Sequence, residues 1–279
     1  MKNIILVVLY NEIITESQTF TSLVKAFLNK KGMADNYTVL FWDNSTAEVN
    51  KNYIDKALVS IKEVGLAAKY VNTPENIALS KIYNRVINEF IEERDYLFIL
   101  DQDSDFDEGY FSSFHNITSK NNPDIILPIV NFKEQIVSPT KVFYLKGFYY
   151  KKAPHGFISN RNVSAINSGM IVSFSYIKKK TFRYNEKLRN YCTDDDIMQF
   201  VRKNETTVYV MDYAFEHDLS LCTLNLNSDS LRNRYNEMVR SKKILYSRNI
   251  VENIFVGLYF TIHRIYMATK YKDAKYLKG

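Results

Sequence analysis

Hydrophobic residues along the first hundred positions recur in two alternating patterns. Four short runs are almost wholly apolar, at 2–9, 37–42, 66–71 and 96–100. Such runs are typical of strands that are buried on both faces of a sheet. Between them, apolar residues recur every three or four positions, which predicts helices around 20–28, 54–61 and 79–90. This alternation predicts a parallel sheet with right-handed crossovers, and so an α/β fold with helices flanking the sheet.

The pattern is less regular after residue 105. Apolar runs predict strands at 125–130, 164–174 and 207–211, and the segment 135–150 fits either a hairpin or a mobile loop. A helical spacing covers 194–203, and two long helices are predicted beyond about residue 224. We therefore expect one α/β domain over 1–223, with two halves that divide near residue 105, and a helical extension over 224–279.

Composition excludes several classes of protein. The chain has 279 residues, 46% of them hydrophobic, with only 8 Gly and 5 Pro. A disordered chain and a turn-rich all-β protein are both disfavoured. The two cysteines, Cys192 and Cys222, belong to no Cys/His cluster. We expect neither a zinc site nor a disulfide framework, as in a protein of the reducing cytosol.

Positive charge is concentrated at the end of the chain. Residues 231–279 contain eleven Lys/Arg and three Asp/Glu, a net +8, whereas residues 1–230 carry a net −2. The slightly acidic body argues against nucleic-acid binding. No stretch of about 18 uncharged apolar residues exists that would span a membrane. Basic helices with interleaved aromatics instead predict contact with an anionic membrane surface. These aromatics are Tyr235, Tyr246, Phe255, Tyr259, Phe260, Tyr266 and Tyr271. The alternative is that the helices pack on the α/β domain or form a homodimer.

Polar residues follow each of the first four predicted strands. Ligands of doubly wound sheets bind beyond the carboxyl ends of the strands, so these residues should meet at one edge. They are Tyr10, Asn11 and Glu12, then Asp43, Asn44 and Ser45, then Asn72 and Thr73, and finally Asp101, Gln102 and Asp103.

Asp101 and Asp103 are the sharpest chemical signal. Two carboxylates two residues apart, just past a buried strand, can converge on one hard cation such as Mg²⁺ or Mn²⁺. Such a metal neutralises charge on a leaving diphosphate. The alternative is a solvated acidic loop, because Asp105, Asp107 and Glu108 follow.

The runs ILVVLYNE (5–12), VLFWDNS (39–45) and YLFILDQDS (96–104) together resemble glycosyltransferase family 2, the inverting enzymes of the GT-A fold. The LDQDS segment is similar to the bacterial rhamnosyltransferase-like branch. Further similar segments follow in order at 76–87, 166–174, 191–203, 213–220 and 246–249. The resemblance covers about residues 2–250 and implies a GT-A fold.

The resemblance also implies roles for individual residues. The nucleotide half, about 1–105, should bind the donor, and the acceptor half, about 106–223, should hold the acceptor. Residues expected to contact the nucleotide sugar are Leu9, Tyr10, Asn11, Asp43, Asn76, Lys81, Gln102, Ser168 and Gly169. Asp101 and Asp103 should hold the metal on the diphosphate, with His217 as a possible third ligand.

The catalytic base is expected among Asp194, Asp195 and Asp196, at the start of a predicted helix. An inverting transfer needs one carboxylate to take the proton of the acceptor hydroxyl. Matching this segment to the family's Glu-Asp pattern favours Asp194, whereas counting back from Asn204 favours Asp195. The chain departs from the family here, and also at Asn76-Ile77-Ala78, where the family often has Asn-x-Gly.

The expected function is transfer of a sugar from dTDP-rhamnose or a UDP-hexose to a saccharide. That acceptor is expected to be lipid-linked and to serve bacterial surface polysaccharide synthesis at the inner face of the cell membrane. One alternative, a sugar-nucleotide pyrophosphorylase, would have a Gly-rich basic loop where Tyr10-Asn11-Glu12 stands. The other is a non-catalytic carbohydrate-binding or membrane-surface protein on the same scaffold.

Overall fold

The computed structural model of the chain describes residues 1–47, 49–217 and 228–278. Cys222 and the predicted domain boundary at residues 223 and 224 therefore lie outside the described residues. The elements, in chain order, are β1 (Asn3–Leu9), η1 (Ile14–Glu16), α1 (Gln18–Phe27), α2 (Lys31–Ala34), β2 (Tyr37–Asp43), α3 (Lys51–Glu63), β3 (Ala67–Asn72), α4 (Leu79–Phe90), β4 (Tyr96–Asp101), α5 (Glu108–Thr118), β5 (Ile125–Phe132), β6 (Gln135–Ser138), β7 (Thr140–Phe143), β8 (Lys146–Tyr149), β9 (Gly156–Ile158), β10 (Val163–Ser164), β11 (Met170–Ser173), α6 (Phe174–Lys180), α7 (Thr193–Lys203), β12 (Val208–Glu216), α8 (Ser228–Tyr246), α9 (Ile250–Tyr271) and η2 (Ala274–Leu277).

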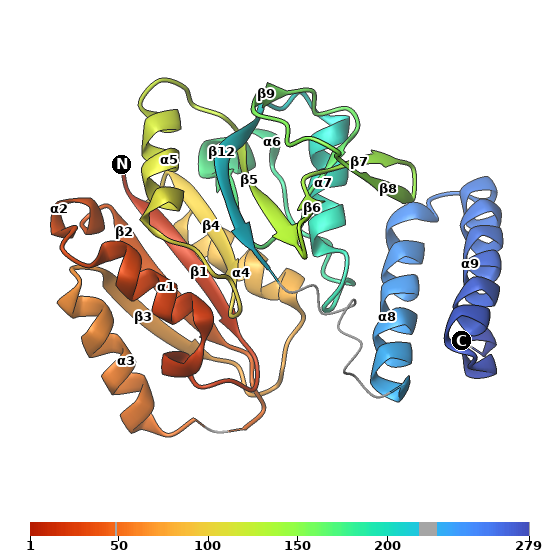
Figure 1. The fold of residues 1–279 in the computed structure, drawn as a ribbon, viewed down its shortest axis with the longest axis horizontal. Coiled ribbons are helices and arrows are strands. Elements are labelled where there is room, and N and C mark those ends of the chain that lie inside the picture. The colour runs from red at the N-terminus through yellow and green to blue at the C-terminus, as the bar shows by residue number, and fades with distance from the viewer. Residues whose placement is uncertain (48, 218–227, 279) are drawn as a thin grey trace.

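A mixed, mostly parallel sheet runs through the centre of the molecule (Figure 1). Its strand order is β3-β2-β1-β4-β11-β5-β12-β9, and β6 pairs with β5. The four strands predicted from the first hundred residues are mutually parallel. Strand β11 runs antiparallel between β4 and β5, and β12 is parallel to β5. The predicted α/β fold is confirmed.

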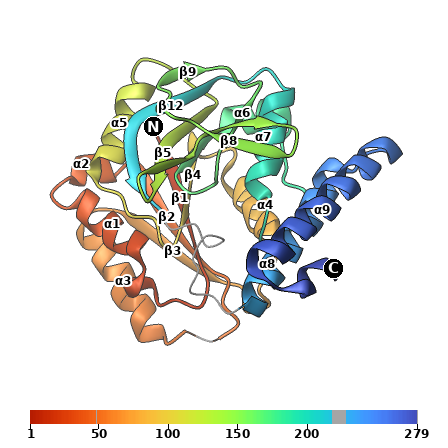
Figure 2. The same cartoon turned by 45° about the vertical axis from the view of Figure 1, so that its right-hand side comes forward.

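Helices cover both faces of this sheet, as Figures 1 and 2 show. In β1, Ile5, Val7 and Leu9 point into the core under α1, α3 and α5. The alternate residues of the same strand, such as Ile4 and Leu6, pack with α4, α6 and α7. Both sides of β1 are thus buried, which explains why its sequence is continuously apolar.

The predicted strand over 164–174 is wrong as one continuous element. Strand β10 ends at Ser164, and β11 begins only at Met170. Between them Gly169 has a φ of +81°, a left-handed backbone that breaks an extended strand. At the other end, Ser173 caps helix α6 through a hydrogen bond from the Tyr176 amide, so the chain turns helical at Phe174.

Helices α8 and α9 form a hairpin beside α7 at the end of the sheet opposite β3 (Figures 1 and 2). Three of the seven aromatics predicted to face a membrane, Tyr235, Tyr246 and Phe260, are instead buried in a separate core. That core also contains Leu188 and Cys192 from the segment before α7. The hairpin is therefore packed on the α/β domain. Among the described residues, no helix has both the length and the apolar character needed to cross a lipid bilayer.

Candidate active site

The loop after β4 is held by hydrogen bonds from two other parts of the chain. The Thr19 hydroxyl donates to the carbonyl of Asp101, and its oxygen accepts from the Ser104 amide at 3.0 Å. The Ser104 hydroxyl also lies 2.8 Å from the hydroxyl of Ser168. These contacts fix the loop at the carboxyl end of β4, so that Asp101 and Asp103 project beyond the sheet edge.

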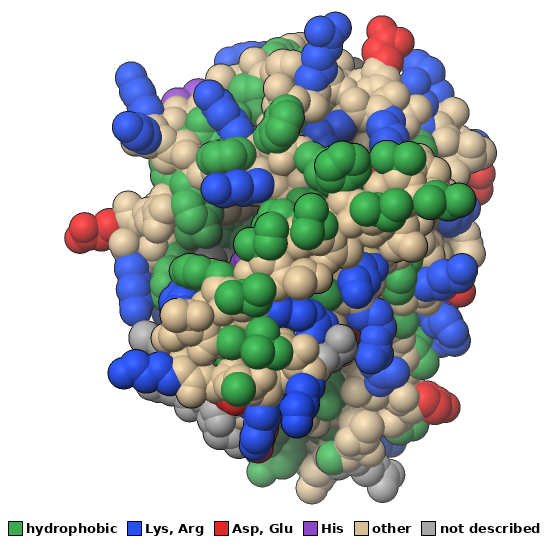
Figure 3. Space-filling view, turned by 90° about the vertical axis from the view of Figure 1, so that its right-hand side faces the viewer, with side chains coloured by type: hydrophobic (Ala, Val, Ile, Leu, Met, Phe, Trp, Pro, Cys, Tyr) green, Lys and Arg blue, Asp and Glu red, His purple; other side chains and the backbone are tan. Residues whose placement is uncertain are grey.

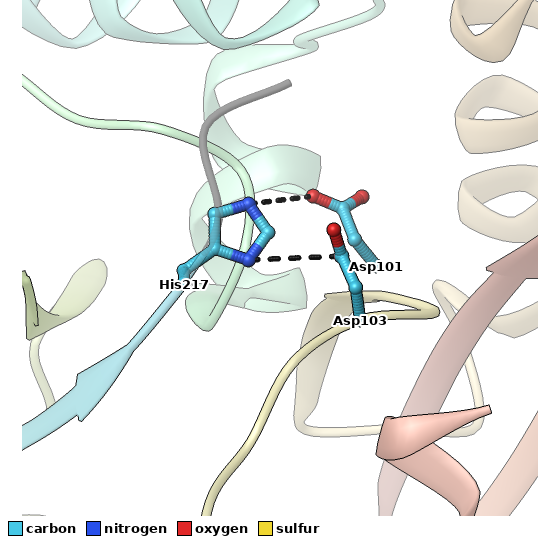
Figure 4. Close-up of side chains that lie close together, drawn as sticks. All are labelled: Asp101, Asp103 and His217. Atoms are coloured by element: carbon cyan, nitrogen blue, oxygen red, sulfur yellow. Dashed lines mark ion pairs between the residues drawn. The ribbon is translucent and has the colours of Figure 1, made fainter. Parts of the chain in front are cut away.

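Asp101, Asp103 and His217 come together at this edge (Figure 4). His217 directly follows β12, and its amide donates to the carbonyl of Asn131 at 3.0 Å. Its Nε2 lies 4.0 Å from Asp101 Oδ2, and its Nδ1 lies 3.6 Å from Asp103 Oδ1. One ligand atom from each of the three residues lies within 4.8 Å of the others. This spacing allows all three to reach one cation.

The cluster has the properties of a divalent metal site. The His217 side chain is only 9% exposed, and its buried Nδ1 has no hydrogen-bond partner among the residues that the structure describes. Burial raises the pKa of the Asp101 carboxyl to about 6; His217 opposes this rise, and Asp103 adds to it. Two carboxylates and one imidazole suit Mn²⁺ or Mg²⁺. A cation here would give the imidazole a partner and would stabilise both carboxylates in their charged form.

A hollow of about 360 Å³ opens beside this cluster. Besides the cluster, it contains three other residues predicted to contact the donor: Tyr10, Asn76 and Gln102. The Gln102 side-chain oxygen accepts from the Tyr10 amide at 2.7 Å, which joins the loops after β1 and β4. The Tyr10 side chain is accordingly free to face the hollow, and the residue is 47% exposed.

Asn44 forms part of the same hollow and organises the loop before α4. Its Nδ2 donates to Asn76 Oδ1 at 3.0 Å and to the Ile77 carbonyl at 2.8 Å. Its Oδ1 accepts from the Thr73 hydroxyl at 2.8 Å and from the Ile77 amide at 3.0 Å. Two of these contacts hold the Ile77 backbone and two hold the side chains of Thr73 and Asn76, so together they fix the loop around Asn76, whose φ is +47°. The side chain of Asn44 therefore shapes the hollow by positioning its wall.

The structure does not bring every predicted donor-binding residue to this hollow. Leu9 and Asp43 are both 0% exposed. The Asp43 carboxylate accepts from the Tyr70 hydroxyl at 2.7 Å and from the Ser45 amide at 2.9 Å, so both of its oxygens are engaged within the protein. Asn11 lies in a neighbouring hollow, and Lys81 is an exposed residue of α4 that lines neither one.

Ser168 and Gly169 lie under the loop rather than in the hollow. Ser168 is 1% exposed, and its hydroxyl contacts Ser104. A Cβ at Gly169 would lie 2.8 Å from Phe215 and from Pro128, and its φ is +81°. Gly169 is expected from the resemblance to contact the nucleotide sugar, but in this structure its close neighbours are the protein's own side chains.

The three consecutive aspartates of α7 meet three different surroundings. Asp196 accepts from the Asn185 amide at 2.7 Å. Asp195 forms an ion pair with Lys242 of α8, in which the two side chains are 15% and 17% exposed. Asp194 instead faces a hollow of about 340 Å³ that the β7–β8 hairpin and residues 164–166 also line. Its Oδ1 accepts the amide of Asp195 at 2.8 Å.

The pKa of the Asp194 carboxyl is raised towards neutral pH. Burial raises its pKa to about 7; Asp195 adds to the rise, and Lys242 opposes it. The negative charge of Asp101 also raises it, which places the aspartate within electrostatic reach of the metal cluster. A carboxylate with a pKa near the working pH is suited to take a proton in catalysis.

Two residues of this region gave no signal in the sequence. Asn190 lines the hollow beside the metal cluster, and its amide donates to Glu237 of α8 at 3.2 Å. It lies in an irregular loop between α6 and α7, where no periodicity marks it. Lys242 is one of many basic residues in the tail, and only the packing of α8 on α7 distinguishes it.

The sequence matches no protein-family profile and no curated protein. Solved structures with the same fold include S. aureus TarS 1–349 in complex with UDP, at 14% identity and a TM-score of 0.55, over 99% of this chain and 73% of that one. The complex of TarS 1–349 with UDP-GlcNAc matches at 13% identity and a TM-score of 0.54, over 92% and 69% of the two chains. GalNAc-T7 with UDP, GalNAc and Mn²⁺ matches at 11% identity and a TM-score of 0.56, over 79% and 44%.

The fold is thus that of the GT-A-like glycosyltransferases, with a central mixed sheet flanked by helices. At these identities the comparison establishes the architecture, and the activity has to be argued from the residues of this chain.

Proposed function

We propose that the protein is a metal-dependent glycosyltransferase that uses a nucleoside diphosphate sugar as donor. The convergence of Asp101, Asp103 and His217 at the carboxyl edge of the sheet carries this proposal. In this fold class the strand ends are where ligands bind. Structural neighbours that bind UDP and UDP-GlcNAc support a nucleotide-sugar donor.

The hollow beside the cluster provides the contacts that such a donor needs. The exposed ring of Tyr10 offers a face on which a pyrimidine base stacks, since aromatic rings prefer offset stacking. Asn76 and Asn190 offer amide groups to the ribose and the sugar. Asp101, Asp103 and His217 would hold Mn²⁺ or Mg²⁺ on the diphosphate. The metal, when bound, neutralises charge on the departing diphosphate.

Asp194 is the residue that we assign as catalytic base. Its carboxylate takes the proton of an acceptor hydroxyl while that oxygen bonds to the anomeric carbon of the donor sugar. The bond from this carbon to the diphosphate oxygen breaks, and the diphosphate leaves with the electron pair. Attack opposite the leaving group inverts the configuration at the anomeric carbon. Asp195 and Asp196 are held by Lys242 and Asn185, so they are the weaker candidates.

The two halves of the α/β domain contribute to different parts of the proposed site. Residues 1–105 contribute Tyr10, Asn76, Asp101 and Asp103 to the donor hollow, whereas Asp194 faces a hollow formed by residues of the 106–223 half. The acceptor is proposed to enter through this second hollow. The sequence resemblance favours family 2 and its rhamnosyltransferase-like branch, with dTDP-rhamnose or a UDP-hexose as donor and a lipid-linked saccharide as acceptor.

We further propose that α9 lies on the inner face of the cell membrane. Its outward face is aliphatic as well as aromatic: Ile254 is 65% exposed, Leu258 58% and Ile262 61%. This spacing puts the three residues on one face of the helix. The sequence pattern predicts membrane contact for both C-terminal helices, but α8 packs on α7 in the structure. The apolar face of α9 is therefore the surface that we assign to lipid.

Donor binding tests the proposal directly. Thermal unfolding is measured with UDP, dTDP and their sugars, each with and without Mn²⁺. A ligand that binds only the folded state raises the apparent stability. We expect one nucleotide family to raise the melting temperature in the presence of Mn²⁺ and not in EDTA. Asp103→Ala should abolish the rise. Asp212→Ala is the control, because its side chain is 97% exposed and lies outside the hollow. Equal rises with and without Mn²⁺ in all three proteins contradict the metal site.

A further inference from the structure

A cavity of about 760 Å³ lies between the β7–β8 hairpin, the end of α7 and the junction of α8 with α9. None of the residues assigned above to donor, metal or base lines it. Its walls include the aromatic rings of Phe143, Tyr144, Tyr246 and Phe255. Four cationic side chains and four aromatic rings therefore share one cavity.

The positive charges of this cavity exceed its negative charge. Arg161, Arg202, Lys203 and Arg248 face a single carboxylate, Glu252. Within the described ranges, no carboxylate oxygen lies within 4.0 Å of the charged nitrogens of these four cations. Burial lowers the pKa of Lys203, and the neighbouring charges of Arg248 and Arg202 lower it further, against the smaller opposing effects of Glu252 and Asp196. Such crowding of like charges favours a bound anion.

Gln199 provides an independent indication of a ligand. The residue is 8% exposed and lines the cavity. Its side-chain oxygen accepts from Lys203 at 3.1 Å and from the Arg248 guanidinium. Its Nε2 and the Tyr246 hydroxyl beside it are both buried, and neither has a described hydrogen-bond partner within 3.5 Å. A buried donor without an acceptor costs free energy, and an anionic oxygen in the cavity would supply that acceptor.

The opposite rim of the cavity is apolar and continues onto α9. Phe143 is 78% exposed and Phe255 is 62% exposed. Phe255 adjoins the face of Ile254, Leu258 and Ile262. The space-filling view shows hydrophobic side chains gathered on this side of the molecule, with Lys and Arg side chains around them and a hollow next to them (Figure 3). A headgroup in the cavity would thus have an apolar surface beside it for its chain.

We infer that this cavity binds the phosphate or diphosphate group of a membrane lipid, while the apolar chain of that lipid runs along α9. Three guanidinium groups match phosphate oxygens because each presents paired N–H donors in one plane. The exposed apolar rim selects a lipid over a free anion. Charge complementarity and continuity with the membrane-facing helix both point to this occupant.

The same cavity gives the lipid a role that rests on the proposed function. The β7–β8 hairpin lines this cavity with Phe143 and Tyr144, and it lines the hollow of Asp194 with Gly147 and Tyr149. A saccharide attached to the phosphate would pass the hairpin on its way to the base. The lipid is then the carrier of the acceptor.

Vesicle flotation in EDTA, without donor, tests the binding site. Vesicles of phosphatidylcholine contain either phosphatidic acid, which has a phosphate monoester, or phosphatidylglycerol at equal charge. We expect the parent protein to prefer phosphatidic acid. Arg202→Gln with Arg248→Gln should weaken that binding about tenfold or more, since a hydrogen bond to a charged group contributes about 1.5–3 kcal/mol. Phe143→Ser, at an exposed position, should weaken it without changing the melting temperature.

Lys270→Gln with Lys272→Gln is the matched control, because it removes the same charge from the end of α9, outside the cavity. Equal losses in both charge variants, or no preference between the two anionic lipids, would overturn the site. Inorganic pyrophosphate that binds as tightly as the lipid would assign the cavity to a soluble anion instead. Asp103→Ala should bind these vesicles like the parent. If the parent protein binds these vesicles but shows no nucleotide binding, the glycosyltransferase proposal is refuted and this site still stands.

Discussion

Three consecutive aspartates at the start of α7 show how position on a helix decides the chemistry of a residue. Successive helical side chains point about 100° apart. Asp195 therefore meets Lys242, Asp196 meets the Asn185 amide, and only Asp194 faces the hollow under the β7–β8 hairpin. The family resemblance favoured Asp194 and helix counting favoured Asp195, and the packing of α8 supports the first choice.

Asp194→Asn should reduce sugar transfer by about 10²–10⁴-fold, the usual contribution of a general base. Donor binding should be unchanged, because Asp194 does not line the hollow beside the metal cluster. In the parent, transfer should rise as pH increases through about 7, where Asp194 loses its proton. Steady-state rates against pH check this expectation. Asp196→Asn serves as control and should keep most of the turnover. Near-normal turnover of Asp194→Asn would place the base elsewhere.

The same substitution should stabilise the fold at alkaline pH. The folded-state pKa of Asp194, about 7, lies above its ordinary value of 3.8, so the folded protein favours the protonated form. That contribution to stability is complete below pH 3.8 and is lost as pH rises through 7. Asn does not ionise in this pH range, so Asp194→Asn should not show this fall in stability. Urea unfolding should show the variant to be more stable than the parent at pH 8 and equal to it near pH 4. A variant less stable at pH 8 would contradict the assigned pKa.

Helix α8 is coupled to the candidate base through one buried ion pair. Lys242→Met should destabilise the protein by about 3–5 kcal/mol, because it leaves the Asp195 carboxylate buried without a partner. Urea unfolding gives the free energy of unfolding of each variant. Adding Asp195→Leu to Lys242→Met should recover most of the loss, since no charge then remains unpaired. Additive losses in the double variant would show that the two residues do not interact.

The continuously apolar strands and periodic helices of the first hundred residues were predictable, because burial on both faces requires such patterns. The run over 164–174 misled us because apolarity alone cannot reveal a left-handed backbone at Gly169 or a cap at Ser173. Strand β12 continues to Glu216, beyond the apolar run that predicted it, because pairing with β5 extends it.

The site was predictable where chemistry and strand ends coincide. Asp101 and Asp103 follow a buried strand, and His217 follows β12, so their convergence follows from the sheet. Asp43 fits the same rule, yet its carboxylate turns inward to Tyr70. Side-chain direction of this kind depends on neighbours distant in sequence. The pairing of Lys242 with Asp195 depends on how α8 docks, which no local pattern determines.

At the scale of the whole molecule, α8 packs on the α/β domain, and α9 carries an exposed apolar face. Ile254→Ser with Leu258→Ser should abolish or strongly reduce flotation with anionic vesicles, because the two exposed side chains would no longer bury apolar surface in lipid. Melting temperature should stay within a few degrees of the parent, as both residues are more than half exposed. Val59→Ser, at 54% exposure on α3, is the control. Unchanged flotation would assign this face to a protein partner.

Asp101, Asp103 and His217 are proposed to support catalysis on a nucleotide sugar. The most direct measurement is release of nucleoside diphosphate from UDP- and dTDP-sugars, with and without Mn²⁺. We expect the parent protein to release it with Mn²⁺ and to stop in EDTA. Asp103→Asn should be slower by about 10²-fold or more, the scale expected when charge stabilisation of the leaving group is lost. Release that continues at the parent rate in EDTA, or in Asp103→Asn, would show that these residues hold no metal needed for catalysis.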